Sequence, residues 1–133
     1  YTNSGSNVSG GNNNFAASIV DVAIRTGLLS EHMELLRDTY RKRVHVMARV
    51  LANTLPEASF KTPSGGYYFW VVLPEGSDAV SLERQALEAG VALRSGPAFS
   101  GEGLFRNCLR LCFAMSETDE IEEGLRRLGC AYS

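Results

Sequence analysis

The sequence predicts an α/β domain in which one small sheet and its covering helices form a sandwich, preceded by a loop and a long helix. Three observations lead to this fold. From Phe60 onward the apolar pattern gives the order strand, strand, helix, strand, strand, helix. Residues 67–73 (YYFWVVL) are apolar on both faces, which indicates a central strand covered on both sides. Residues 33–51 carry a long apolar stripe at helical spacing, which indicates an amphipathic helix.

The first part of the chain is expected to be a loop followed by two helices. Residues 1–14 are almost all small and polar, so they offer little apolar surface to offset the entropy of ordering. The first helix is capped by Asn13 or Asn14 and ended by Gly27. The second helix has Ser30 as its N-cap. The stripe of the first helix consists of Phe15, Ile19, Val22 and Ala23, and that of the second of Met33, Leu36, Tyr40, Val44, Met47 and Leu51.

The remaining elements belong to the sandwich, and turns rich in glycine and proline separate them. Strands are expected over residues 60–62, 67–73, 91–94 and 108–114. A Pro-x-Gly-Gly turn joins the first two of these strands in a hairpin. A helix over residues 81–89 precedes the third strand, and a last helix begins at Ser116, where Ser116 and Asp119 have the spacing of a capping box.

The composition excludes several classes of function. Hydrophobic residues make up 44% and charged residues 21% of the chain, and the net charge is -2, so a nucleic-acid partner is not expected. No apolar run reaches the roughly 18 residues that a membrane span needs. Cys108, Cys112 and Cys130 match no zinc spacing. We expect reduced core thiols, no metal site, and a cytosolic or organellar protein, with the cytoplasm as its expected location.

Arg110 is the side chain whose position suggests a binding role. In the expected strand CLRLCFA the leucines and the phenylalanine alternate onto one face, and Arg110 shares the other face with the two cysteines and Ala114. Because these neighbouring side chains are small, they leave space above the sheet for a guanidinium. The N–H donors of a guanidinium lie in one plane and match the two oxygens of a carboxylate. An ion pair with one of the protein's own carboxylates stays open as the alternative. The aromatic run at residues 67–70 is interpreted as core rather than as a stacking platform.

Four stretches, in matching order and spacing, resemble one family. PSGGYYFWVVLPEG is similar to the Pro-x-Gly-Gly-aromatic-Phe-x-Trp-x-x-Leu-Pro segment of class I/II aminotransferases, which are fold-type-I enzymes that depend on pyridoxal phosphate. GVALRSGPAFS is similar to their Gly-Val-x-x-x-x-Gly-x-x-Phe segment. CLRLCFA with SETDEIEEGLRRLG resembles their Leu-Arg-Leu-x-Phe-Ala strand and closing helix, and LLRDTYRKRVHVM their long helix. The resemblance runs from about Gly10 to the C-terminus and is greatest to the branch with 2-aminoadipate and kynurenine aminotransferases.

The resemblance implies roles for two residues and for two parts of the chain. In this family the strand arginine binds the α-carboxylate of the amino acid substrate, a role that falls on Arg110, and Phe99 is expected to help line the entrance. Residues 1–29 would end a large cofactor-holding domain, and residues 30–133 would form the small C-terminal domain that closes over it. A homodimer that acts in amino acid metabolism, on amino acids and 2-oxo acids, is implied as well.

The sequence departs from the family in one respect. Transamination needs a lysine amine that forms a Schiff base with pyridoxal phosphate, and this chain has only Lys42 and Lys61, neither in the family's sequence context. We therefore expect no catalytic and no cofactor-binding residue here, and an inactive chain when it is alone. Its first residue, Tyr1, indicates a fragment, a processed product or an incomplete gene model.

Two other functions are kept as alternatives to an enzyme. Aminotransferase-like domains also serve as effector-binding modules of transcription regulators, and a winged-helix region upstream would favour that function. The chain could also act as a stand-alone fragment that binds a small ligand without a cofactor.

Overall fold

The computed structural model describes residues 13–132, and the chain divides into two compact units between Asp38 and Thr39. Most of the expected loop over residues 1–14 lies outside the described residues, although Asn14 is helical. The elements are α1 (Asn14–Arg25), α2 (Leu28–Thr54), β1 (Ser59–Phe60), β2 (Tyr68–Val72), α3 (Ala79–Glu88), β3 (Arg94–Ser95), the short 3-10 turn η2 (Gly96–Phe99), β4 (Cys108–Cys112) and α4 (Thr118–Tyr132). The predicted α/β architecture is confirmed.

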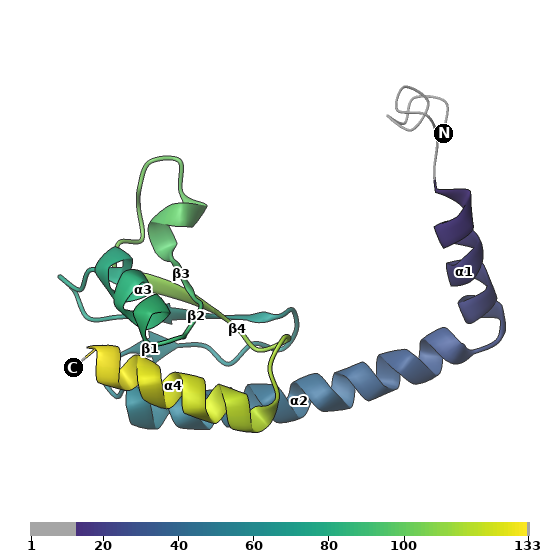
Figure 1. Ribbon diagram of the computed structural model, residues 1–133, viewed down its shortest axis with the longest axis horizontal. Helices are drawn as coiled ribbons and strands as arrows, with labels where there is room; N and C mark the ends of the chain where they lie inside the picture. Colours follow the sequence, from purple (N-terminus) through teal and green to yellow (C-terminus); the bar gives the residue numbers. More distant parts are fainter. Residues whose placement is uncertain (1–12, 133) are drawn as a thin grey trace. The chain divides into compact units, whose positions relative to one another are not determined.

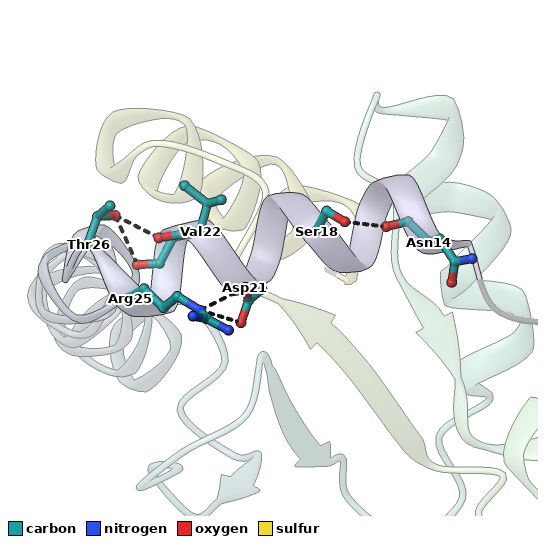
Figure 2. Close-up of polar contacts among 7 residues, drawn as sticks. Asn14, Ser18, Asp21, Val22, Arg25 and Thr26 are labelled. Carbon is teal, nitrogen blue, oxygen red and sulfur yellow. Dashed lines mark hydrogen bonds and ion pairs between the residues drawn. The ribbon is translucent and has the colours of Figure 1, made fainter.

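Helix α1 makes contacts within its own turns, and Figure 2 shows those of Ser18 with Asn14, of Arg25 with Asp21 and of Thr26 with Val22. The side-chain oxygen of Asn13 accepts a hydrogen bond from the Ala16 amide at 3.1 Å, so Asn13 is the cap. Arg25 forms an ion pair with Asp21 at 2.9 Å. Gly27 ends the helix with a φ of 81°, as expected. The apolar stripe is present, but no residue of α1 is buried.

Helix α2 starts earlier than expected. It begins at Leu28, so Ser30 lies inside its first turn and the predicted N-cap is wrong. The single glycine before Leu28 is enough to separate the two helices. The predicted stripe is confirmed toward the C-terminal end, where Met47 and Leu51 are buried, whereas Met33 near the start is 40% exposed.

Within residues 13–132 the strands form one antiparallel sheet in the order β1-β2-β4-β3. Strand β2 is therefore central, as predicted, and β1 and β2 form the expected hairpin with Phe60 opposite Val71. The strand expected over residues 91–94 begins only at Arg94. The reason is that the Val91 amide donates to the Ala86 carbonyl at 2.7 Å, which closes α3 instead of pairing with the sheet.

The two faces of the sheet differ. One face packs on the core that α3, α4 and the C-terminal part of α2 form, and Figure 1 shows α4 beside that part of α2. Arg43 of α2 joins the two helices through an ion pair with Glu117 at 2.5 Å. The other face carries Tyr68 and Trp70, which are 43% and 36% exposed. The prediction that β2 is covered on both sides is therefore wrong for this chain. We call the exposed side the open face; its residues are Tyr68, Trp70, Arg110 and Cys112.

Helices α3 and α4 also begin at other residues than expected. Asp78 caps α3 by accepting hydrogen bonds from the Val80 and Ser81 amides, which moves the start to Ala79. At α4 the Glu117 amide donates to the Glu120 carboxylate at 2.8 Å. This is half of a capping box, shifted one residue from the predicted pair.

The cysteines are all free, as expected, but only Cys108 is buried, and Cys112 and Cys130 are exposed. Two of the three are thus not core thiols. Of the helices between residues 13 and 132, none combines the length and the apolar character that a membrane span requires. The same residues contain no group of three or more His, Cys, Asp or Glu side chains arranged to hold a metal ion.

Candidate functional site

Arg110 lies in the middle of β4, on the open face. Trp70 of β2 is opposite it on one side, and Arg94 of β3 is opposite it on the other. The alternation of β4 buries Leu109 and Leu111 in the core and leaves Arg110 half-buried. The strand therefore presents a cation on the side of the sheet that the helices do not cover.

Two aromatic rings flank the guanidinium of Arg110. Its Cζ atom lies 4.1 Å from the centroid of the Tyr68 ring and 4.4 Å from that of Phe99. Both distances are well within the range of cation–π attraction. Tyr68 is the diagonal neighbour of Arg110 across the strand pair, since Trp70 is directly opposite, and aromatic side chains bridge such diagonals. The neighbouring side chains on β4, Cys108 and Cys112, are small, as expected. The space beside them is filled by the rings of Tyr68 from β2 and Phe99 from η2.

The donors of Arg110 are unpaired within residues 13–132, where it forms neither an ion pair nor a hydrogen bond. The alternative of an ion pair with one of the protein's own carboxylates is therefore not observed in this part of the chain. A cation–π contact attracts the guanidinium to the face of a ring, and the ring offers no carboxylate or carbonyl oxygen to its N–H groups. The arrangement leaves the donor fork available to a ligand.

Phe99 is brought to Arg110 by a close-packed loop. Gly96 starts η2 at a point where a Cβ atom would lie 2.2 Å from the Phe105 carbonyl oxygen, so only glycine fits. Phe105 itself has a φ of 62°, a conformation that bulky residues rarely adopt. The ring of Trp70 lies 5.8 Å from that of Phe99 and 5.7 Å from that of Phe105, both edge to face. These contacts fix the loop on the open face.

Glu83 of α3 anchors the start of the same loop. Its carboxylate accepts hydrogen bonds from the Ser95 amide at 2.9 Å, the Ser95 hydroxyl at 2.5 Å and the Arg94 guanidinium at 3.3 Å. Burial raises the pKa of Glu83, but the hydrogen bonds from Ser95 and Arg94 outweigh it and hold the pKa below its ordinary value. Arg94 and Arg110 are directly opposite, where like charges repel. Glu83 neutralises Arg94, so of these two arginines only Arg110 has no carboxylate partner within residues 13–132.

The lysines do not belong to this site. Lys42 is exposed on α2, and Lys61 is exposed after β1, which β2 separates from β4. The described residues thus offer a group that can bind an anion but no amine beside it for covalent chemistry. A Schiff base at this site would need an amine from outside them.

Sequence reasoning singled out Arg110 and Phe99, and the structure brings these two side chains together. It missed Tyr68, because the aromatic run was interpreted as core. That interpretation is right for Phe69, which is fully buried, and wrong for Tyr68 and Trp70. The alternation of the run could have revealed this, since Tyr68 and Trp70 share the face opposite to Phe69.

Comparison with known proteins supports a common origin. The family model described as aminotransferase class I and II matches residues 4–128. The 2-aminoadipate transaminase of Thermus thermophilus is 40% identical over 103 residues, which is 77% of this chain and 26% of that protein. An uncharacterised HTH-type transcriptional regulator of Escherichia coli, YjiR, is 29% identical over 77% of this chain and 22% of its own length.

A solved structure shows the same fold. The α-aminoadipate aminotransferase of Thermus thermophilus, crystallised with N-(5'-phosphopyridoxyl)-L-leucine, superimposes with a TM-score of 0.74 at 38% identity, covering 78% of this chain and 27% of that one. The chain thus spans about a quarter of the length of these relatives. The family match over most of the chain and the shared fold together show that this chain belongs to the class I and II aminotransferases and has the α/β fold of a portion of a fold-type-I enzyme.

Proposed function

We propose that this chain is the C-terminal portion of a pyridoxal-phosphate-dependent aminotransferase, and that Arg110 binds the carboxylate of its substrates. The complete protein would transfer an amino group between an amino acid and a 2-oxo acid. The observation that carries this proposal is the guanidinium of Arg110, which has no protein carboxylate as a partner within residues 13–132.

The chemistry of the donor set fits both substrates. Amino acids and 2-oxo acids share one group, a carboxylate next to the carbon that exchanges nitrogen for oxygen. A guanidinium can hold that carboxylate by two parallel hydrogen bonds, which fixes orientation as well as position. Such a clamp places the reacting carbon in the same position for both half-reactions. The role of Arg110 is binding and orientation, not proton transfer.

The remaining chemistry belongs to other parts of the complete protein. Bound pyridoxal phosphate supplies the electron sink on which amino-group transfer depends. The lysine that holds it and the groups that bind its phosphate and ring nitrogen would lie outside this chain, since neither Lys42 nor Lys61 has the sequence context of the family's lysine. We expect the 133-residue chain to be inactive when it is alone.

We propose that the first part of the chain packs within the large domain of the complete protein. Residues 1–29 would belong to that domain and residues 30–133 to the small one. In support, the apolar side chains of α1 are exposed, Phe15 at 77% and Ile24 at 58%, as is Leu28 at the start of α2 at 58%. Such surface is normally covered in a complete protein. Homodimer assembly and a cytoplasmic location stay predictions.

The proposal is tested by steady-state kinetics of the complete protein. We expect Arg110→Ala to raise the KM for the amino acid about 100-fold, the cost of losing a charge-assisted pair of hydrogen bonds. Arg84→Ala removes an exposed arginine on α3, away from the open face, and should leave the KM unchanged. An unchanged KM in Arg110→Ala would show that the substrate carboxylate binds elsewhere.

A second candidate function is an effector-binding module of a transcription regulator, and the similarity to YjiR favours it. In that case Arg110 would bind an amino acid effector without turnover. A winged-helix region in the coding sequence of the complete protein would support the regulator. A cofactor-binding lysine there in its family context, without such a region, would support the enzyme. A stand-alone fragment, the remaining alternative, would have neither.

A further inference from the structure

We propose that Tyr68 is a positioning residue: together with Phe99 it holds the guanidinium of Arg110 in its binding orientation before a carboxylate arrives. The inference rests on the proposed function of Arg110. It adds an explanation of how the Arg110 side chain is ordered in the free protein while its N–H donors stay free for a carboxylate. Tyr68 would act through Arg110 and not by contact with the substrate.

The first step concerns the order of the side chain. An arginine has many rotamers, and if the side chain is mobile in the free protein, ordering it on binding costs entropy and opposes the ligand. Here the rings of Tyr68 and Phe99 lie 4.1 Å and 4.4 Å from the guanidinium carbon. The contact restricts the side chain in the free protein, so less ordering remains to oppose binding.

The second step concerns competition. A protein carboxylate could also order Arg110, but it would occupy the donor fork that the substrate needs. An aromatic ring attracts the cation through its face and, unlike a carboxylate, offers no oxygen atoms that would occupy the two parallel donors. Glu83, the carboxylate that anchors β3, is already engaged by Ser95 and Arg94. The rings therefore order the guanidinium without competing with its ligand.

The third step concerns the two supports, which come from different elements. Tyr68 is fixed by the pairing of β2 with β4, in which it is opposite Cys112. Phe99 is fixed by η2 and by the edge of Trp70 at 5.8 Å. Because the two rings are held independently, replacing either one should weaken the clamp without removing the other. The ring, and not the hydroxyl, of Tyr68 makes the contact.

The expected effects distinguish position from fold. In the complete protein we expect Tyr68→Leu to raise the KM for the amino acid about tenfold, because the partly exposed cation–π contact with Arg110 is lost. We expect kcat to change less than about twofold. Tyr68→Phe keeps the ring and should restore the wild-type KM. Phe99→Leu provides a second test on a different element and should also raise the KM. The matched control is Tyr67→Leu, an exposed neighbour whose ring contacts Tyr40 at 5.7 Å and the edge of Tyr68 at 6.4 Å but makes no cation–π contact with Arg110.

A readout independent of turnover is the NMR spectrum of the Arg110 side chain in the free protein. Protons held over two rings are shifted upfield, and the shift should shrink in Tyr68→Leu but persist in Tyr68→Phe. A merely structural role of Tyr68 would lower stability without moving the KM selectively.

The outcomes separate the two proposals. If Arg110→Ala leaves the KM unchanged, the proposed function fails and this inference fails with it. If Arg110→Ala raises the KM but Tyr68→Leu and Phe99→Leu do not, only the positioning role is overturned. The positioning role is also overturned if Tyr68→Phe behaves like Tyr68→Leu, because the hydroxyl would then be the active group. An increase in Tyr68→Leu and Phe99→Leu that Tyr68→Phe and Tyr67→Leu do not share supports it.

Discussion

The two faces of the β2–β4 strand pair differ in burial. On the packed face of β2 and β4, Phe69 and Leu109 are fully buried under the helices. On the open face, one residue further along each strand, Trp70 and Arg110 remain accessible and make contacts with a loop. Strand alternation thus assigns neighbouring residues to different tasks. Replacements on the packed face should cost stability, and those on the open face should cost binding.

The largest effect on stability is expected from Phe69→Ala. The ring is fully buried and contacts Phe60 and Phe113 edge to face. Its removal should lower the free energy of unfolding by about 3–5 kcal/mol, since transfer and cavity terms add. Urea denaturation measures the loss. Trp70→Ala, the adjacent residue on the open face, should cost clearly less; an equal loss in both variants would contradict the division between the faces.

A smaller loss is expected from Gly96→Ala, which overfills the loop that carries Phe99. The new methyl group would lie 2.2 Å from the Phe105 carbonyl oxygen and 2.9 Å from the Cys108 Cβ atom. We expect a loss of about 1–3 kcal/mol in the free energy of unfolding. Gly101→Ala is the control, because nothing lies within 4 Å of that position. If both variants were equally stable, the close packing of the loop would be disproved.

Glu83→Gln tests the anchor of β3. It should cost about 1 kcal/mol at neutral pH, because the charge-assisted bonds to Ser95 and Arg94 are weakened. The folded pKa of Glu83 lies below its unfolded value, so the wild-type advantage is complete above the unfolded pKa and disappears as the pH falls through the folded one. Stability measured against pH, with Glu102→Gln as an exposed control, checks this. A gap that stays constant down to acid pH would refute the assignment.

The smallest effect is a difference in thiol reactivity that leaves stability unchanged. Burial raises the pKa of the Cys108 thiol, and its side chain is buried, whereas Cys112 at the other end of β4 is exposed. Brief treatment of the folded chain with iodoacetamide should modify Cys112 and Cys130 and spare Cys108. Peptide mass spectrometry locates the labels. Equal labelling of Cys108 in the folded chain would contradict its burial.

Local signals made the helices predictable. Asn13 caps α1 through its side chain and Gly27 ends the helix through its backbone conformation. Both act within a few residues, so the sequence alone predicts them. The start of α2 was misplaced because Ser30 is a good cap by type, while the turn at Gly27 had already ended the previous helix. The late start of β3 depends on the Val91 amide, which either α3 or the sheet could use.

The site was predictable only in part, because some of its contacts join segments that are far apart in the sequence. Alternation along one strand was enough to place Arg110 away from the leucines. Its contact with Tyr68 depends on the register between β2 and β4, and its contact with Phe99 depends on the path of a glycine-containing turn. Neither register nor turn path follows from the periodicity of a single segment. Apolar character on both sides of β2 also cannot show that one side stays uncovered.

The central claim is that Arg110 recognises a carboxylate, and a ligand that differs only in that group tests it most directly. The affinity of the complete protein for L-leucine and for isopentylamine, which lacks the carboxylate, should be measured by calorimetry in the wild type and in Arg110→Ala, as a double-mutant cycle. We expect the wild type to prefer the amino acid about 100-fold and Arg110→Ala to lose most of this preference. A preference that is the same in both proteins would contradict this role of Arg110.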